Sequence, residues 1–106
     1  MRKNKYNNSK TSVDGITFDS KKEARRYCDL KLLERAGDIS KLELQPQYSF
    51  AGPFAHIGKY TADFRYIRNG EVIVEDVKSP ATAKKTDYRL RVRMMKGFYN
   101  IDVLET

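Results

Sequence analysis

Hydrophobic and polar positions alternate along much of the chain, and this pattern predicts several β-strands. The strongest local signal is Asn69-Gly70, a dipeptide that type I′ hairpin turns prefer because both of their central residues need positive φ. Alternating residues lie on both sides of it. We therefore predict two antiparallel strands, roughly 59–68 and 71–78, joined by this turn.

Helical spacing and capping residues predict two helices. Ser20, followed three residues later by Glu23, matches the capping box at a helix start, and Gly37 is the residue type that ends helices. The first helix should therefore span about 21–36. A second helix is predicted to start at about Thr82 or Thr86 and to run to residue 96, closed by the glycine that follows.

Three further segments complete the predicted topology. Residues 11–18 form a short strand or hairpin that turns at an Asp-Gly pair, and residues 99–104 form a last strand. Residues 42–50 alternate as a strand, which should be bulged or at a sheet edge because Pro46 has no ladder donor. The order β-α-β-β-β-α-β predicts an α/β or α+β fold with a central mixed sheet flanked by helices.

Length and charge narrow the class of protein. The 106 residues suffice for one domain, over 11–106, preceded by a basic, aperiodic stretch over 1–10 that reads as a flexible arm. A net charge of +7 favours phosphate-bearing partners. The single cysteine, Cys28, excludes an internal disulfide or a cysteine-based zinc cluster. No apolar run approaches a membrane span, so a cytoplasmic protein without a membrane partner is the default expectation.

The predicted hairpin brings two carboxylates together. With Asn69-Gly70 as the turn, Asp63 faces Asp76, and facing side chains have Cβ atoms roughly 5 Å apart. Two like charges at that spacing repel, so a hard divalent cation such as Mg²⁺ between them would relieve the pair. Lys78 shares their face because side chains alternate along a strand. Glu75 points to the opposite face and is excluded.

Each of these residues also has an ordinary structural explanation. Glu23 could serve only as the third residue of the capping box, although a helix packed on the sheet would let it complete a metal site. Asp63 could pair with Arg65 or with a lysine across the sheet, and Lys78 could be solvated. The two facing aspartates and the lysine on their face are harder to explain in that way.

Asp63, followed by Asp76-Val77-Lys78, resembles the D…(D/E)-x-K signature of the PD-(D/E)XK nuclease superfamily. The segment Phe18–Ala24, with Tyr27 and Leu30 following, resembles the N-terminal helix of that superfamily, which carries an extra acidic residue. Together with the strand Tyr60–Phe64, it is similar to a phage-encoded family of small basic proteins of that superfamily, and more distantly to phage junction-resolving endonuclease I. Ala62 stands where the superfamily has its proline.

The resemblance implies a restriction-endonuclease-like core and a role for each residue. Asp63 and Asp76 would bind Mg²⁺, which Mn²⁺ can replace, with the Val77 carbonyl as a further ligand and Glu23 binding directly or through water. Lys78 would act on the attacking water. The expected protein is a metal-dependent DNA endonuclease of a bacterial cell that carries a phage or prophage.

The expected cleavage is structure-directed or weakly specific, on branched or recombination-intermediate DNA, and a homodimer is compatible with the resemblance. An alternative is a non-catalytic nucleic-acid-binding module that keeps the nuclease fold. An RNA-binding or ribosome-associated basic protein is a third alternative, but it gives no reason for opposed aspartates.

Basic side chains of the second predicted helix are the candidates for contact with the DNA backbone. Three of them recur at helical spacing and form one stripe, and two more precede them. The five candidates are Lys84, Lys85, Arg89, Arg93 and Lys96. A basic helix face is often only solvated, so the composition favours DNA without deciding it. His56, the only histidine, reads as a surface residue.

Overall fold

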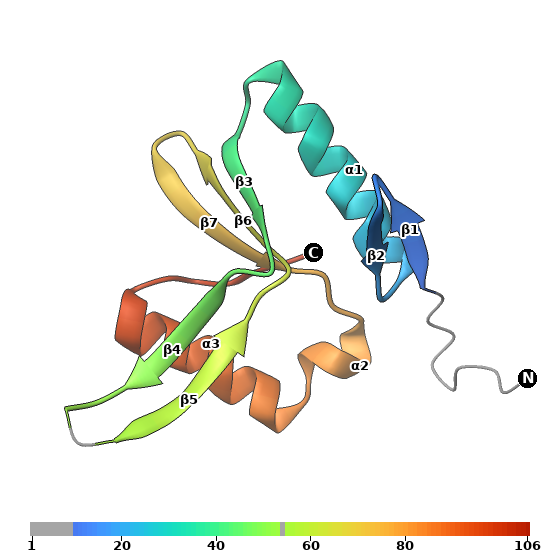
Figure 1. The fold of residues 1–106 in the computed structure, drawn as a ribbon. Helices are drawn as coiled ribbons and strands as arrows, with labels where there is room; N and C mark the ends of the chain where they lie inside the picture. The colour runs from blue at the N-terminus through green and yellow to red at the C-terminus, as the bar shows by residue number, and fades with distance from the viewer. Residues whose placement is uncertain (1–9, 54) are drawn as a thin grey trace, which may run out of the picture.

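The computed structural model describes residues 10–53 and 55–106 (Figure 1). The basic arm predicted over residues 1–10 lies outside the described residues except for Lys10. The elements, in chain order, are β1 (Thr11–Val13), β2 (Ile16–Phe18), α1 (Lys21–Ala36), β3 (Ser40–Leu44), β4 (Gln47–Ala51), β5 (His56–Thr61), β6 (Phe64–Arg68), β7 (Glu71–Asp76), α2 (Pro80–Ala83), α3 (Thr86–Tyr99) and β8 (Leu104–Glu105).

The N-terminal third follows the predicted pattern. Strands β1 and β2 pair as an antiparallel hairpin whose turn residues, Asp14 and Gly15, both have positive φ. Helix α1 begins after Ser20, whose side chain accepts a hydrogen bond from the Glu23 amide, and ends at Gly37 with φ of 85°. Only glycine adopts such a φ without strain, which is why the helix stops there.

The central hairpin is confirmed in its register. Strands β6 and β7 pair antiparallel from Phe64 opposite Glu75 to Arg68 opposite Glu71, so Asn69 and Gly70 form the turn. Both turn residues have positive φ, as a type I′ turn requires. Strand β7 ends at Asp76, two residues earlier than predicted.

The strands predicted over 42–50 and 59–68 are each divided in two, which corrects those predictions. Strand β3 pairs with β6 in a four-stranded sheet, whereas β4 pairs with β5 in a separate ribbon. The first division falls at Gln45, whose φ is 51°, and at Pro46, which has no amide donor. The second division falls at Ala62 and Asp63, directly opposite the first. Both paired strands are therefore interrupted at the same point, between the pairs Leu44–Phe64 and Gln47–Thr61.

The C-terminal prediction is also corrected. The predicted second helix is two helices, α2 and α3, and Gly97 lies inside α3, which ends at Asn100 in the left-handed conformation. The predicted last strand over 99–104 is only β8, which lies parallel to β7 at the edge of the sheet. The four-stranded sheet has the order β3-β6-β7-β8 and is therefore mixed, as predicted.

The sheet separates two hydrophobic cores. Helix α1 packs on one face, where Leu30 and Tyr27 meet Phe64 and Tyr66. On the opposite side, α3 and the β4–β5 ribbon share a core in which Met95 is wholly buried. The result is a mixed α+β fold with helices on both sides of the sheet (Figure 1).

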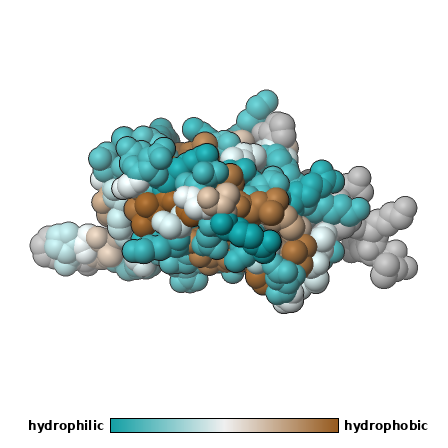
Figure 2. Space-filling view, turned by 90° about the horizontal axis from the view of Figure 1, so that it is seen from above, coloured by the Kyte–Doolittle hydropathy of each residue, from teal (hydrophilic) through white to brown (hydrophobic). Residues whose placement is uncertain are grey.

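Three of the large hydrophobic side chains left exposed belong to α3: Leu90, Phe98 and Tyr99. The others are Leu32 of α1, Ile57 of β5, Val72 of β7 and Leu104 of β8. Figure 2 shows hydrophobic patches interrupted by hydrophilic side chains on the face seen there. Within residues 10–53 and 55–106, no helix is long and apolar enough to cross a membrane.

Candidate functional site

Asp63 lies where the β4–β5 ribbon meets the four-stranded sheet. The break is closed by two backbone hydrogen bonds, from Gln45 N to Asp63 O at 3.0 Å and from Ala62 N to Pro46 O at 3.1 Å. The register of the paired strands is the same on both sides of the break. Asp63 therefore lies at the bend between two antiparallel pairs, β3–β6 and β4–β5, that keep the same register.

Asp63 and Asp76 are adjacent, as the hairpin register predicts, and hydrogen bonds connect each side chain to the backbone of the other strand. Asp63 N donates to Asp76 Oδ1 at 2.9 Å, and Val77 N donates to Asp63 Oδ2 at 2.8 Å. The Tyr60 hydroxyl donates to Asp76 Oδ2. Both oxygens of Asp76 thus accept a hydrogen bond from an uncharged donor.

The two carboxylates perturb each other electrostatically. Burial, and then the charge of Asp76, raise the pKa of Asp63 to about 7. Burial also raises the pKa of Asp76, although the Tyr60 hydroxyl and the Lys78 charge oppose that rise. Among the described residues, neither aspartate forms an ion pair, so the predicted alternative of an Asp63–Arg65 pair is not found.

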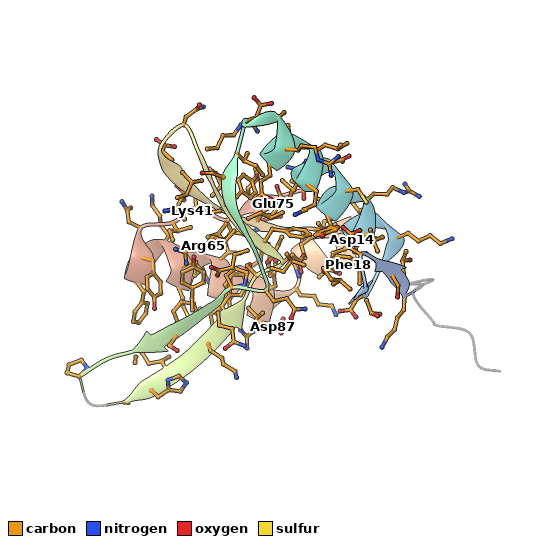
Figure 3. The ribbon with its side chains drawn as sticks, turned by 45° about the horizontal axis from the view of Figure 1, so that its top comes forward. Asp14, Phe18, Lys41, Arg65, Glu75 and Asp87 are labelled. Atoms are coloured by element: carbon orange, nitrogen blue, oxygen red, sulfur yellow. The ribbon has the colours of Figure 1, made fainter. Side chains whose placement is uncertain are left out.

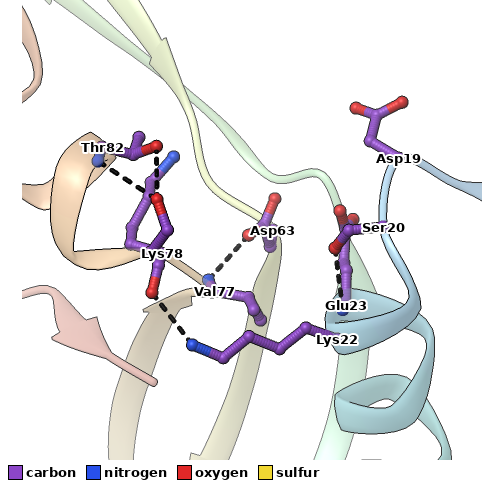
Figure 4. A pocket seen from close by; sticks show the side chains of 9 residues that line it. Asp19, Ser20, Lys22, Glu23, Asp63, Val77, Lys78 and Thr82 are labelled. Carbon is purple, nitrogen blue, oxygen red and sulfur yellow. Dashed lines mark hydrogen bonds between the residues drawn. The ribbon is translucent and has the colours of Figure 1, made fainter. Parts of the chain in front are cut away.

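A pocket of about 260 Å³ opens beside Asp63 and brings Glu23 and Lys78 to the same place (Figure 4). Its remaining lining comes from the start of α1 and from the segment between β7 and α2: Asp19, Ser20, Lys22, Val77, Ser79 and Thr82. A second pocket next to it is also lined by Asp63 and Glu23, together with Gln45. Asp76 lines neither pocket.

Glu23 takes part in the helix cap and also lines the pocket, while its role as a metal ligand stays a prediction. Its backbone amide donates to Ser20 Oγ at 3.1 Å, as a capping residue does. Its half-buried side chain lines the pocket, where burial and then the charge of Asp19 raise its pKa. The charge of Asp76 also raises it, whereas Lys78 lowers it. The cap thus orients the side chain toward the aspartates.

Lys78 lies beside the carboxylates with its ammonium group over an aromatic ring. Its Nζ is 4.8 Å from the centroid of the Tyr88 ring. Its backbone is held on both sides, because Lys78 N donates to Thr106 O at 3.1 Å and Lys22 Nζ donates to Lys78 O at 3.0 Å. The residue is positioned at the pocket, and its charge acts on both aspartates and on Glu23.

Glu75 lies on the opposite face of β7 from Asp76, as predicted. It is wholly buried and forms a bidentate ion pair with Arg26 of α1, at 2.7 and 2.8 Å. The Tyr66 hydroxyl donates to it at 3.0 Å. Figure 3 shows Glu75 on the α1 side of the sheet and Arg65 on the α3 side. Glu75 is therefore a neutralised structural carboxylate.

The predicted DNA-contacting residues are all exposed, but they differ in their partners. Arg89 pairs with Glu105 at 2.6 Å, and Lys96 with Asp102 at 3.1 Å. Lys84, Lys85 and Arg93 form no ion pair within the described part of the chain. Part of the predicted basic stripe is thus neutralised locally, and its contact with DNA stays a prediction.

Sequence reasoning missed several residues of the site. Tyr60 donates to Asp76 and Tyr88 lies under Lys78, yet neither belongs to a recognisable motif. Both are buried aromatic residues, which the pattern assigns only to the core. Asp19 lies in the segment that resembles the nuclease helix, directly before the helix cap, but no role was predicted for it; its charge acts on Glu23.

The side chains at the pocket fit in part the divalent cation that the resemblance implies. Asp63 and Glu23 offer carboxylate oxygens to one pocket, and oxygen ligands are those that Mg²⁺ prefers. Within the described part of the chain neither aspartate forms an ion pair, although the Lys78 charge acts on both. However, the described residues contain no group of three acidic, histidine or cysteine side chains close enough to hold a metal. The residues fit a cation at Asp63 and Glu23, while direct ligation by Asp76 stays a prediction.

These observations describe a small mixed α+β protein with a carboxylate-lined pocket at a bend between a sheet and a ribbon. The family model "Protein of unknown function (DUF1064)" matches residues 3–104, so the chain belongs to this family. Comparison with curated proteins and with solved structures finds no match.

Proposed function

We propose that the protein is a metal-dependent DNA endonuclease with a restriction-endonuclease-like core. The observation that carries this proposal is the adjacent pair Asp63–Asp76, which has no cationic ion-pair partner among the described residues and lies beside Lys78. A site that must bind a cation and a phosphate needs negative ligands and a separate positive group near them. The net charge of +7 suits a nucleic-acid substrate.

Each side chain has a proposed task in hydrolysis of the phosphodiester bond. Asp63 and Glu23 would hold Mg²⁺ or Mn²⁺, with the Val77 carbonyl and Asp76 as further ligands. The bound ion supplies Lewis acidity at the phosphate and a water of lowered pKa. Lys78 cannot ligate a cation while it is protonated, so it orients the attacking water or stabilises the charge that develops on the phosphate.

The proposed substrate is branched DNA, or DNA that is cleaved with weak sequence specificity, in the cytoplasm of a bacterium that carries a phage or prophage. The chain is short and offers few side chains for reading bases in sequence. A homodimer would place two pockets on one branched substrate. These finer proposals rest on the resemblance of Asp63 and Asp76-Val77-Lys78 to the nuclease signature.

One observation favours a second candidate, a non-catalytic nucleic-acid-binding module. Asp76 uses both oxygens for hydrogen bonds, and the described residues contain no three-ligand cluster. A protein that needs no metal could keep the aspartates as a hydrogen-bonded brace between β6 and β7. Such a module would bind DNA equally well with and without divalent cations and would not cleave it.

A cleavage assay separates the two candidates. The full chain is incubated with linear, single-stranded and four-way-junction DNA in Mg²⁺, Mn²⁺ or EDTA, next to Asp63→Asn and Asp29→Asn. Asp29 is an exposed aspartate on α1 and serves as the matched control. We expect divalent-dependent cleavage by the wild type and by Asp29→Asn, and none by Asp63→Asn. DNA binding without cleavage under every condition would favour the module.

A further inference from the structure

The β4–β5 ribbon has one covered face and one open face. Tyr48, Phe50 and Tyr60 point inward and are buried in the core shared with α3. Two rings of α3 complete this packing, since Phe98 lies 5.3 Å from Phe50 and Tyr99 lies 5.1 Å from Tyr48, between ring centroids. Helix α3 therefore covers the inner face, and the outer face is exposed to solvent.

The outer face is mainly polar and carries no negative charge. In the paired register the outward positions are Gln47, Ser49, Ala51, Lys59 and Thr61, with His56 opposite Ala51 beyond a register shift, and all six are exposed. Ile57, which is 59% exposed, is the large apolar side chain on this side of β5. The sequence from 44 to 62 contains no Asp or Glu, although the chain has 14 acidic residues. The face thus offers an amide, hydroxyls and a cation, with no carboxylate to repel phosphate.

Helix α3 also fixes the backbone of both strands. The Tyr99 hydroxyl donates to Ser49 O at 2.5 Å on one strand, and Arg91 Nε donates to Lys59 O at 3.4 Å on the other. These bonds anchor the ribbon to the helix from both strands. A rigid, preformed surface loses little conformational entropy when it binds a partner.

The ribbon leads to the candidate site. Gln47 opposite Thr61 is its last pair before the bend at Asp63. Beyond that pair, Gln45 and Asp63 line one pocket together with Glu23. At ~3.3 Å per residue, β5 from His56 to Thr61 spans roughly 17 Å, about five base-pair steps of duplex DNA. Figure 1 shows the ribbon projecting from the sheet as an arm.

We propose that the outer face of the β4–β5 ribbon binds duplex DNA in its major groove and places the DNA backbone at the Asp63 pocket. A two-stranded ribbon fits the major groove of B-form DNA, whereas the deep, narrow major groove of duplex RNA excludes it. The delivery of the backbone to Asp63 rests on the proposed nuclease function. Binding along the ribbon does not, because it needs neither metal nor cleavage.

Two serines allow a matched test. Ser49 is exposed on the outer face of the ribbon, and Ser40 is exposed on β3, in the four-stranded sheet. Binding of the full chain to a labelled 20-base-pair DNA duplex is measured in EDTA for the wild type, Ser49→Glu and Ser40→Glu. A carboxylate in the groove repels phosphate, so Ser49→Glu should weaken binding about tenfold or more. Ser40→Glu should change it less than twofold, and both should melt near the wild-type temperature.

Lys59→Ala supplies an independent variant that keeps the strand intact. Removing one phosphate contact should reduce the slope of log affinity against log salt by roughly 0.9. The proposal is overturned if Ser49→Glu and Lys59→Ala both bind duplex DNA as the wild type does. It is also overturned if duplex RNA competes as well as duplex DNA, or if Ser49→Glu changes only self-association in sedimentation, which would make a second copy the partner.

The ribbon surface and the nuclease function can be refuted independently of each other. Ribbon-dependent binding to DNA by a protein that never cleaves would support the ribbon surface and refute the nuclease function. Divalent-dependent cleavage that is unaffected by Ser49→Glu and Lys59→Ala would refute the ribbon surface and leave the nuclease function in place.

Discussion

Strand β7 ends with two neighbouring buried carboxylates whose surroundings differ. Glu75 faces α1, where the Arg26 guanidinium and the Tyr66 hydroxyl neutralise and hydrogen-bond it. Asp76 faces the other way, next to Asp63, and its hydrogen-bond donors are the Tyr60 hydroxyl and the Asp63 amide. Glu75 thus has a cationic partner within the fold, whereas the hydrogen-bond donors to Asp76 are uncharged.

The contrast shows which carboxylate is available for chemistry. A buried charge that is paired and hydrogen-bonded is stable as it is, whereas two adjacent carboxylates without a cation are stabilised by one. The exposed fractions alone do not distinguish them, since Glu75 is 0% exposed and Asp76 1%. Their hydrogen-bond and ion-pair partners do.

The greatest loss of stability is expected when the ion pair between Arg26 and Glu75 is broken. Arg26→Ala leaves Glu75 buried without its cation, which should lower the free energy of unfolding by about 3–5 kcal/mol. Denaturant unfolding measures this loss. Arg25→Ala is the control, because Arg25 is the exposed neighbour on the same helix and should change stability by less than about 0.5 kcal/mol. Equal small effects in both variants would show that the Glu75 pair contributes little.

The next effect is on the rate of the proposed reaction. Lys78→Ala should lower single-turnover cleavage of DNA by about 10²- to 10³-fold, because one preorganised positive group is lost. Metal affinity should hold or rise slightly, since the carboxylates lose a neighbouring positive charge. Lys41→Ala, at an exposed lysine of β3, should cleave normally. Near-normal cleavage by Lys78→Ala would contradict the assigned role.

A smaller effect concerns pH. The folded-state pKa of Asp63 is about 7, above its ordinary value of 3.8, so the folded state binds a proton more tightly than the unfolded chain. The stabilisation from this proton is complete below pH ~4 and is lost as the pH rises through about 7. In EDTA, the wild type should therefore lose about 2–3 kcal/mol of stability between pH 5 and pH 8 relative to Asp63→Asn, most of it below pH ~7.

Thermal melts at each pH test this prediction. Asp63→Asn keeps a carbonyl that can accept from Val77 N but carries no charge, so its curve should be flatter. Identical pH dependence in the two proteins would mean that Asp63 does not titrate abnormally in the folded state.

The sequence predicted those parts of the fold that depend on local signals. Asn69-Gly70 set the register of β6 and β7, and with it the adjacency of Asp63 and Asp76. Ser20 and Gly37 set the ends of α1. These residues act through backbone conformation within a few positions of themselves, which is why their effect can be read without tertiary structure.

The sequence did not predict the bend or the full surroundings of the site. Positive φ at Gln45 is rare for a residue without a glycine's freedom, and Pro46 gave only a bulge or an edge as the expectation. Gly97 suggested a helix end, but α3 continues to Tyr99, whose hydroxyl bonds to β4. Tyr60 reaches Asp76 only because of the bend, so no local pattern could reveal that contact.

Binding of Mn²⁺, followed by electron paramagnetic resonance, shows whether the Asp63–Asp76 pair is part of a cation site. It is measured on the wild type, Asp63→Asn and Asp29→Asn without DNA, so that neither cleavage nor substrate affinity enters the result. We predict saturable binding to the wild type and to Asp29→Asn, and its loss in Asp63→Asn. No binding to the wild type, or unchanged binding to Asp63→Asn, would contradict a cation site at the uncompensated aspartates.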